Sequence, residues 1–159
     1  MGTRGRELVR DLDPVEIAAT LDSFYCYHMS VMHFAHAVAN RLEGQALFLL
    51  GDELAEVAAD SLEKAGKLAD RVAELGGAIT ADPTDFVARS PIEQFSLPGN
   101  MGDPAVIVGY ALEQVRVIIG AYSDFLDRVR GKDELTYHLV LRLLASEVSR
   151  EDEMEAVLA

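Results

Sequence analysis

The chain of 159 residues has one cysteine, no tryptophan and only three lysines, and most of its charges have one sign. The single thiol, Cys26, cannot form an intrachain disulfide. The net charge is -13, which argues against a nucleic-acid-binding protein because contacts to phosphate need a basic face. No apolar run approaches the ~20 residues that cross a bilayer, and no secretory signal precedes the first one. We therefore expect a cytoplasmic protein that binds neither nucleic acid nor membrane.

The chain does have enough hydrophobic sequence for one folded domain. Half of its residues are hydrophobic and 26% are charged, which is typical of a globular protein and not of a disordered one. A chain of this length buries roughly two-thirds of its unfolded surface, so it needs neither a disulfide nor a metal to fold. We expect an N-terminal arm over residues 1–12 and one domain over residues 13–159.

The pattern predicts four long helices. Asp13-Pro14 and Asp103-Pro104 each place a capping aspartate before a proline in the first helical turn. Glycines at 76, 77 and 131 are typical of helix ends, where the left-handed conformation is common. Between these signals, apolar residues recur at steps of three and four, which indicates one buried stripe per helix. The predicted helices run from 14 to about 40–44, from 45–52 to about 75, from 104 to about 130, and from about 133 to 158.

A long connection separates the second helix from the third. Residues from about 78 to 102 lose the helical period and contain Pro83, Pro91 and Pro98, with room for a short helix near 85–89. So long a connection is uncommon in a compact domain unless it crosses over something. The short links on either side favour antiparallel neighbours. The sequence therefore predicts an all-α four-helix bundle with one long crossover between helices 2 and 3.

Several segments resemble a known family. LADRVAELGG at 68–77 is similar to the end of the second helix in bacterioferritin-like and Dps-like ferritins. GKDELTY at 131–137 resembles the link between their last two helices, and ASEVSRE at 145–151 resembles their final Glu-x-x-His segment. FYCY at 24–27 resembles an aromatic run on their first helix. The resemblance covers residues 10 to 159 approximately and implies a ferritin-like four-helix bundle.

The same resemblance implies where a di-iron centre would lie. The family places one Glu on each of the first and third helices and a Glu-x-x-His pair on each of the others. Only Glu147 keeps a ligand type, and protonated lysine and arginine offer a metal no lone pair. The resemblance therefore implies a degenerate di-iron site without a cofactor. Its vestigial positions would be Thr20, Ser61, Lys64, Val115, Glu147 and Arg150.

A replacement for the metal follows from the charges. A lone carboxylate such as Glu147 is costly inside a bundle, whereas a hydrogen-bonded ion pair is tolerable. We therefore predict a salt-bridge cluster in which Lys64 and Arg150 hold Glu147 at the position of the missing iron. In the alternative, both cations reach outward and Glu147 alone lies inside.

Three other features lie outside this pattern. His33 and His36 are three residues apart on the first helix and could clasp a metal on its outer face, although surface or interface histidines, His28 included, are the commoner interpretation. The apolar run Leu47–Leu50 indicates a subunit interface. A row of carboxylates on the second helix is predicted to be a solvated face or a cage wall; its members are Glu53, Glu56, Asp60 and Glu63.

Two functions remain open. In the first, the protein is a non-catalytic structural or assembly subunit, either in a homo-oligomeric cage or in a hetero-oligomer with an active ferritin-like paralogue. In the second, it is an iron-binding or iron-storage Dps-like ferritin that uses a shifted or intersubunit site, with iron as its cofactor. A radical or hydroxylase scaffold would need the same missing ligands. The replaced ligands favour a protein without enzymatic activity.

Overall fold

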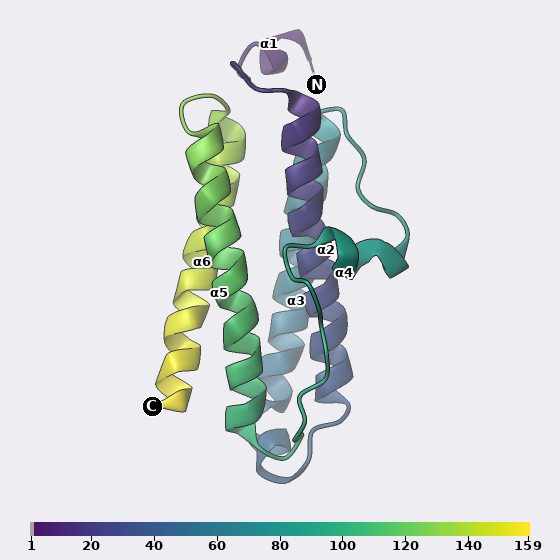
Figure 1. Cartoon of the computed structure of the whole chain (residues 1–159), viewed down its shortest axis with the longest axis vertical. Coiled ribbons are helices and arrows are strands. Elements are labelled where there is room, and N and C mark those ends of the chain that lie inside the picture. The colour runs from purple at the N-terminus through teal and green to yellow at the C-terminus, as the bar shows by residue number, and fades with distance from the viewer. Residues whose placement is uncertain (1) are drawn as a thin grey trace.

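The computed structural model describes residues 2–159 and contains no strand among them (Figure 1). Four long helices form a bundle, so the predicted fold class is confirmed. The second long helix begins one residue before the predicted window. In chain order the elements are α1 (Thr3–Arg6), α2 (Pro14–Ala39), α3 (Gly44–Glu74), the 3-10 turn η1 (Pro83–Asp85), α4 (Phe86–Arg89), α5 (Pro104–Val129) and α6 (Glu134–Leu158).

Local signals in the sequence set the helix ends. The Asp13 carboxylate accepts a hydrogen bond from the Val15 backbone N–H at 2.9 Å, and Asp103 accepts one from Ala105 at the same distance. Each aspartate thus satisfies a backbone donor that the first turn leaves free. Gly76 and Gly131 follow the ends of α3 and α5 with φ of +83° and +72°, a conformation that favours glycine.

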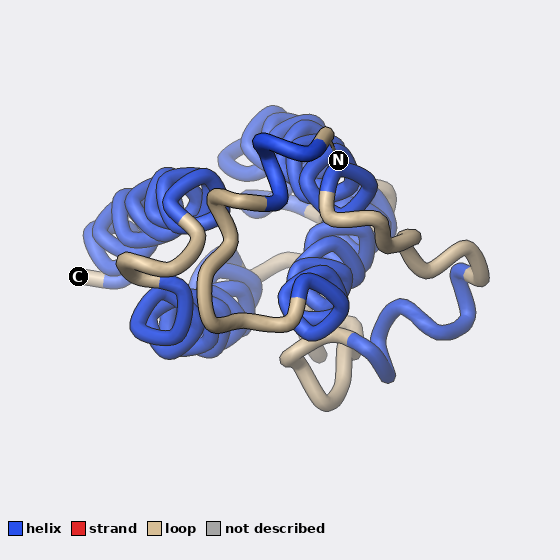
Figure 2. Tube along the Cα trace, turned by 90° about the horizontal axis from the view of Figure 1, so that it is seen from above, coloured by secondary structure: helices blue, strands red, loops and turns tan. Residues whose placement is uncertain are grey.

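The helices pair as the short links predict. α2 packs antiparallel along α3, and α5 along α6, and the view from above shows the two pairs side by side (Figures 1 and 2). The connection between α3 and α5 runs the length of the bundle outside α2, against which α4 packs. Asp22 of α2 fixes this connection, because its carboxylate accepts hydrogen bonds of 2.7 Å from both the backbone N–H and the hydroxyl of Thr80.

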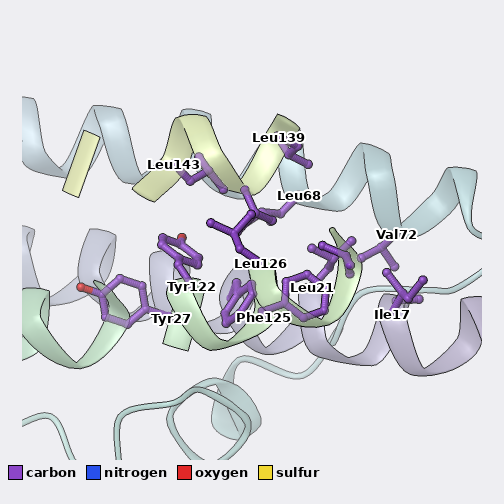
Figure 3. Close-up of a cluster of buried hydrophobic side chains, with 14 of the residues drawn as sticks. Ile17, Leu21, Tyr27, Leu68, Val72, Tyr122, Phe125, Leu126, Leu139 and Leu143 are labelled. Atoms are coloured by element: carbon purple, nitrogen blue, oxygen red, sulfur yellow. The ribbon is translucent and has the colours of Figure 1, made fainter. Parts of the chain in front are cut away.

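The upper half of the bundle, as oriented in Figure 1, holds an apolar core (Figure 3). Leu21, Leu68 and Val72 are at most 1% exposed, and the rings of Phe24 and Phe125 meet edge-on with centroids 5.5 Å apart. Several buried side chains come from α5. By length and composition alone α5 could cross a membrane, but the core helix of a bundle passes the same test. Nine side chains along the length of α5 are buried in this bundle.

The first residues lie over one end of the bundle, where α1 is seen in Figure 1. The backbone N–H of Arg10 donates to the carbonyl of Lys132 at 2.8 Å and ties this segment to the turn between α5 and α6. The predicted arm over residues 1–12 includes Met1, which lies outside the described residues.

Candidate functional site

Four charged side chains of α3 and α6 meet between the helices. Lys64 Nζ lies 2.7 Å from Glu147 Oε1 and 2.8 Å from Asp60 Oδ2. The Arg150 guanidinium lies 3.3 Å from Glu147 Oε2 and also pairs with Asp60. We call these four residues the charged cluster. The predicted pairing of Glu147 with both cations is confirmed, and the alternative with outward-reaching cations is wrong, because the side chains of Lys64 and Arg150 are only 5% and 14% exposed.

Helix periodicity explains the meeting. Asp60 and Lys64 are one turn apart on α3, and Glu147 and Arg150 are three residues apart on α6, so each pair shares a helix face. Both faces continue the apolar stripes that build the core. The charged side chains are therefore buried because the apolar residues on the same faces are buried. The cluster carries two positive and two negative charges, and its balance is what makes burial tolerable.

The local field keeps the outer members of the cluster ionised. Burial alone would raise the pKa of Asp60, but the hydrogen bond and charge of Lys64, joined by Arg150, outweigh it and lower the pKa. Burial would likewise lower the pKa of Arg150, but Glu147 and then Asp60 outweigh it and raise the pKa. Lys64 and Arg150 thus stabilise the charged form of Asp60, and Glu147 and Asp60 stabilise the charged form of Arg150.

Buried aromatic residues and a histidine adjoin the cluster. The His28 Nε2 of α2 lies 2.5 Å from the Tyr122 hydroxyl of α5, and both side chains are fully buried. Burial, and secondarily Lys64 and Arg150, lower the pKa of His28 well below its usual value. Burial and then Glu147 raise the pKa of Tyr122 well above its usual value, so both groups are neutral at physiological pH. The prediction of His28 as a surface or interface residue is thus wrong.

The structure brings some vestigial positions to the cluster and leaves one away from it. Ser61 is fully buried with no hydrogen-bond partner for its Oγ among residues 2–159, and Val115 lines a cavity together with Arg150. Thr20 instead donates its hydroxyl to the Glu16 carbonyl at 3.2 Å and borders a different, surface hollow. Tyr27, two turns further along the same face of α2, reaches the depth of the cluster and feels the charge of Glu147.

Asp60, predicted to lie in a solvated row, has a side chain that is 40% exposed, and it also pairs with Lys64 and Arg150. The signal for the pairing with Lys64 was present, since a carboxylate four residues before Lys64 is the favoured spacing for an ion pair on one helix. His33 and His36 are exposed on α2. In the part of the chain that the structure describes, no three His, Cys, Asp or Glu side chains lie close enough together to hold a metal ion.

The residues around the charged cluster do not fit a pair of iron ions. Iron takes oxygen and imidazole ligands, and a di-iron centre needs several carboxylates facing one another. Here the facing groups include two cations that already occupy the carboxylates, one serine hydroxyl and the apolar Val115. The arrangement holds charge in place and offers no open coordination position.

A bundle of four long helices with one crossover, and with polar side chains of facing helices gathered at its centre, defines the class of ferritin-like proteins. A model of the ferritin-like domain matches residues 18–159. The chain belongs to the ferritin-like family.

Relatives within this family include Dps proteins. The chain is 27% identical over 143 residues to the DNA protection during starvation protein of Pyrococcus furiosus, covering 89% of this chain and 71% of that one. Its fold matches a dodecameric thioferritin, the bacterioferritin-related protein of Bacteroides fragilis, with a TM-score of 0.84, 22% identity and coverage of 92% and 86%. It also matches Dps of Vibrio cholerae, with a TM-score of 0.80, 14% identity and coverage of 91% and 89%.

Proposed function

We propose that this protein is a structural or assembly subunit of the ferritin-like family that does not oxidise iron. The observation that carries the proposal is the charged cluster. Lys64 and Arg150 place two positive charges against Glu147 and Asp60. Lys64 lies 2.7 Å from Glu147 and 2.8 Å from Asp60, and Arg150 lies 3.3 Å from Glu147. These cations compensate the buried carboxylate of Glu147 and the partly exposed carboxylate of Asp60 as metal ions would, so the bundle keeps its shape without a metal.

The proposed assembly rests on exposed apolar surface. Phe48 is 89% exposed, and Leu47 and Leu49 are each about half exposed near the start of α3. A patch of this kind is typical of a subunit contact. The Bacteroides fragilis relative is dodecameric, which supports a closed homo-oligomer, and an active paralogue as partner is the other form. We place the protein in the cytoplasm, bound to neither nucleic acid nor membrane.

An iron titration tests the lack of activity. Ferrous iron is added in air to the purified protein, oxidation is followed by absorbance, and bound iron is counted by elemental analysis after desalting. We expect the oxidation rate of buffer alone and no stoichiometric iron. Particle size is measured on the same sample, and a large particle without iron supports the cage-forming subunit. A protein-dependent oxidation rate would overturn the proposal.

A restored variant tests the assigned positions. Ser61→Glu, Lys64→His, Val115→Glu and Arg150→His return four ligands, and Tyr27→Glu supplies the ligand of α2. The matched control carries Thr20→Glu in place of Tyr27→Glu, because Thr20 lies two turns away from the cluster. We expect iron binding only in the first variant, with folding of both checked by circular dichroism. Equal iron binding by both would show that the α2 position is misassigned.

The alternative function is an iron-storing Dps-like ferritin with a shifted or intersubunit site. The exposure of His33 and His36 on α2 is what keeps it open. In that case the same titration would give bound iron, and the variant His33→Gln/His36→Gln would lose it while the charged cluster remained intact.

A further inference from the structure

An apolar cavity lies beneath the charged cluster, in the lower half of the bundle as drawn in Figure 1. Its volume is about 80 Å³. A hollow of about 500 Å³ opens beside it between α3, α5 and α6. The two spaces share a wall, so together they form one groove that leads from the surface to the interior. The shared lining residues are Leu54, Val57, Ile107, Ala111, Arg150 and Met154.

The inner part of this groove offers almost nothing to water. Its walls are mostly aliphatic and aromatic, with contributions from Val31 and Phe34 of α2. The polar exception is Gln114 of α5, whose buried Oε1 has no hydrogen-bond partner among residues 2–159. Arg150 is the one charged residue on the wall, and its guanidinium is turned to Glu147 and Asp60. Such an apolar cavity is filled favourably by hydrocarbon and poorly by water, which needs two to four polar partners.

The mouth of the groove is acidic. Glu53 of α3 and Glu153 of α6 both line the outer hollow and are exposed. Within residues 2–159, neither carboxylate has a Lys, Arg or His partner within the 4.0 Å of an ion pair. Because the two charges of Arg150 and Lys64 are balanced inside the cluster, the net field at the mouth is negative.

We infer that this groove binds a single-chain amphiphile with a cationic head group. The alkyl tail lies along the shared wall of the groove with only its end in the inner cavity, and the ammonium head lies at the mouth beside Glu53 and Glu153. A fatty acid of the same length would set its carboxylate against two others. The inference does not depend on whether the protein handles iron, because it uses no metal. Leu49 at the rim also belongs to the proposed subunit contact, so the groove opens beside that contact.

Calorimetric titration of the purified protein tests the inference with three probes of equal tail length. They are decylammonium, decanol and decanoate. The neutral probe is kept below its solubility limit and the two ionic probes below their micelle concentrations. We expect decylammonium to bind roughly three- to tenfold more tightly than decanol, as pairing with exposed carboxylates allows. Decanoate should bind more weakly than decanol. Shortening the tail should weaken binding about fourfold per methylene removed.

Two sets of variants locate the site. Ala111→Leu fills the shared wall and should abolish binding of all probes, whereas Ala19→Leu, the same change on the exposed side of α2, should leave it unchanged. Glu53→Gln/Glu153→Gln should remove the preference for decylammonium and leave decanol affinity unaltered. Equal affinity for the three probes, or a preference that survives in the glutamine variant, would refute the cationic head group. Binding of no probe, together with a change of particle size in Ala111→Leu, would show that a second copy of the chain fills the groove.

Discussion

The two halves of the bundle are built on different principles. In the upper half, side chains from all four helices fill a continuous apolar core, and Leu21, Leu68 and Ile118 are fully buried within it. From the level of Lys64 downward the helices enclose the charged cluster and then the groove, which consists of the inner cavity and the outer hollow beside it. The smaller apolar cluster below consists of Val38, Leu42, Ala46 and Ile107.

Because of this difference, we expect the upper half to supply most of the stability and the lower half to bind a ligand. Close apolar packing stabilises the upper half without directional requirements. Balanced ions in the centre add little net stability, but they penalise any arrangement that leaves one of them unpaired. The lower half therefore keeps a defined shape although it is incompletely packed, and this is where we place ligand binding.

The largest expected effect comes from breaking the charged cluster. Lys64→Met removes the short contacts to Glu147 and Asp60 and leaves Glu147 with Arg150 alone at 3.3 Å. Loss of one partner of a buried ion pair lowers the free energy of unfolding by about 3–5 kcal/mol. Urea denaturation followed by circular dichroism measures the change.

Two controls sharpen that measurement. Lys67→Met removes an exposed pair with Glu63 at 2.6 Å on the same helix and should change stability by less than about 1 kcal/mol. Lys64→Met/Glu147→Leu removes both members of the buried pair and should recover much of the lost stability. If Lys64→Met and Lys67→Met lower the free energy of unfolding by the same amount, the ion pairs of Lys64 contribute no more to stability than an exposed pair.

A pair of leucine truncations compares the packing of the two halves. Leu68→Ala empties a site with 0% exposure in the upper core and should lower the free energy of unfolding by about 2–5 kcal/mol. Leu54→Ala makes the same change beside the groove, where the side chain is only partly buried, and should have a clearly smaller effect. Equal effects in the same denaturation assay would mean that the groove is closed in solution.

The sequence predicts the parts of this comparison that depend on one helix at a time. Asp13, Asp103 and the glycines at 76 and 131 mark the helix ends, and the interrupted stripes identify Lys64 and Glu147 as inward-facing. Helix periodicity gives the face of a residue but not its height in the bundle. Thr20 and Tyr27 share a face, yet only Tyr27 reaches the cluster. The pairing of His28 with Tyr122 depends on the register of α2 against α5, which no single-helix pattern contains.

The crossover offers a test of a local contact. Asp22→Ala leaves the backbone N–H and hydroxyl of Thr80 without their acceptor, and the loss of these charge-assisted hydrogen bonds should cost about 1.5–3 kcal/mol. The effect should appear in hydrogen exchange at residues 78–82 more than in the global unfolding transition. Asp82→Ala, which removes an exposed cap with Thr84, is the control and should leave exchange at Thr80 unchanged.

The smallest effect concerns pH and tests whether His28 stays neutral in the folded protein. Its folded pKa is lowered by burial and by Lys64 and Arg150, so below about pH 6.5 the unfolded chain binds a proton that the folded chain does not. Stability should therefore fall as pH falls, by about 1 kcal/mol between pH 7 and 5.5.

The lowered pKa of Asp60 acts in a more acidic window, because its stabilising charge is lost only at pH values below the ordinary pKa of an aspartate. His28→Gln should abolish the slope between pH 7 and 5.5, and His138→Gln, at a site whose side chain is 66% exposed, should keep it. A slope that persists in His28→Gln would show that another group titrates on unfolding in this window.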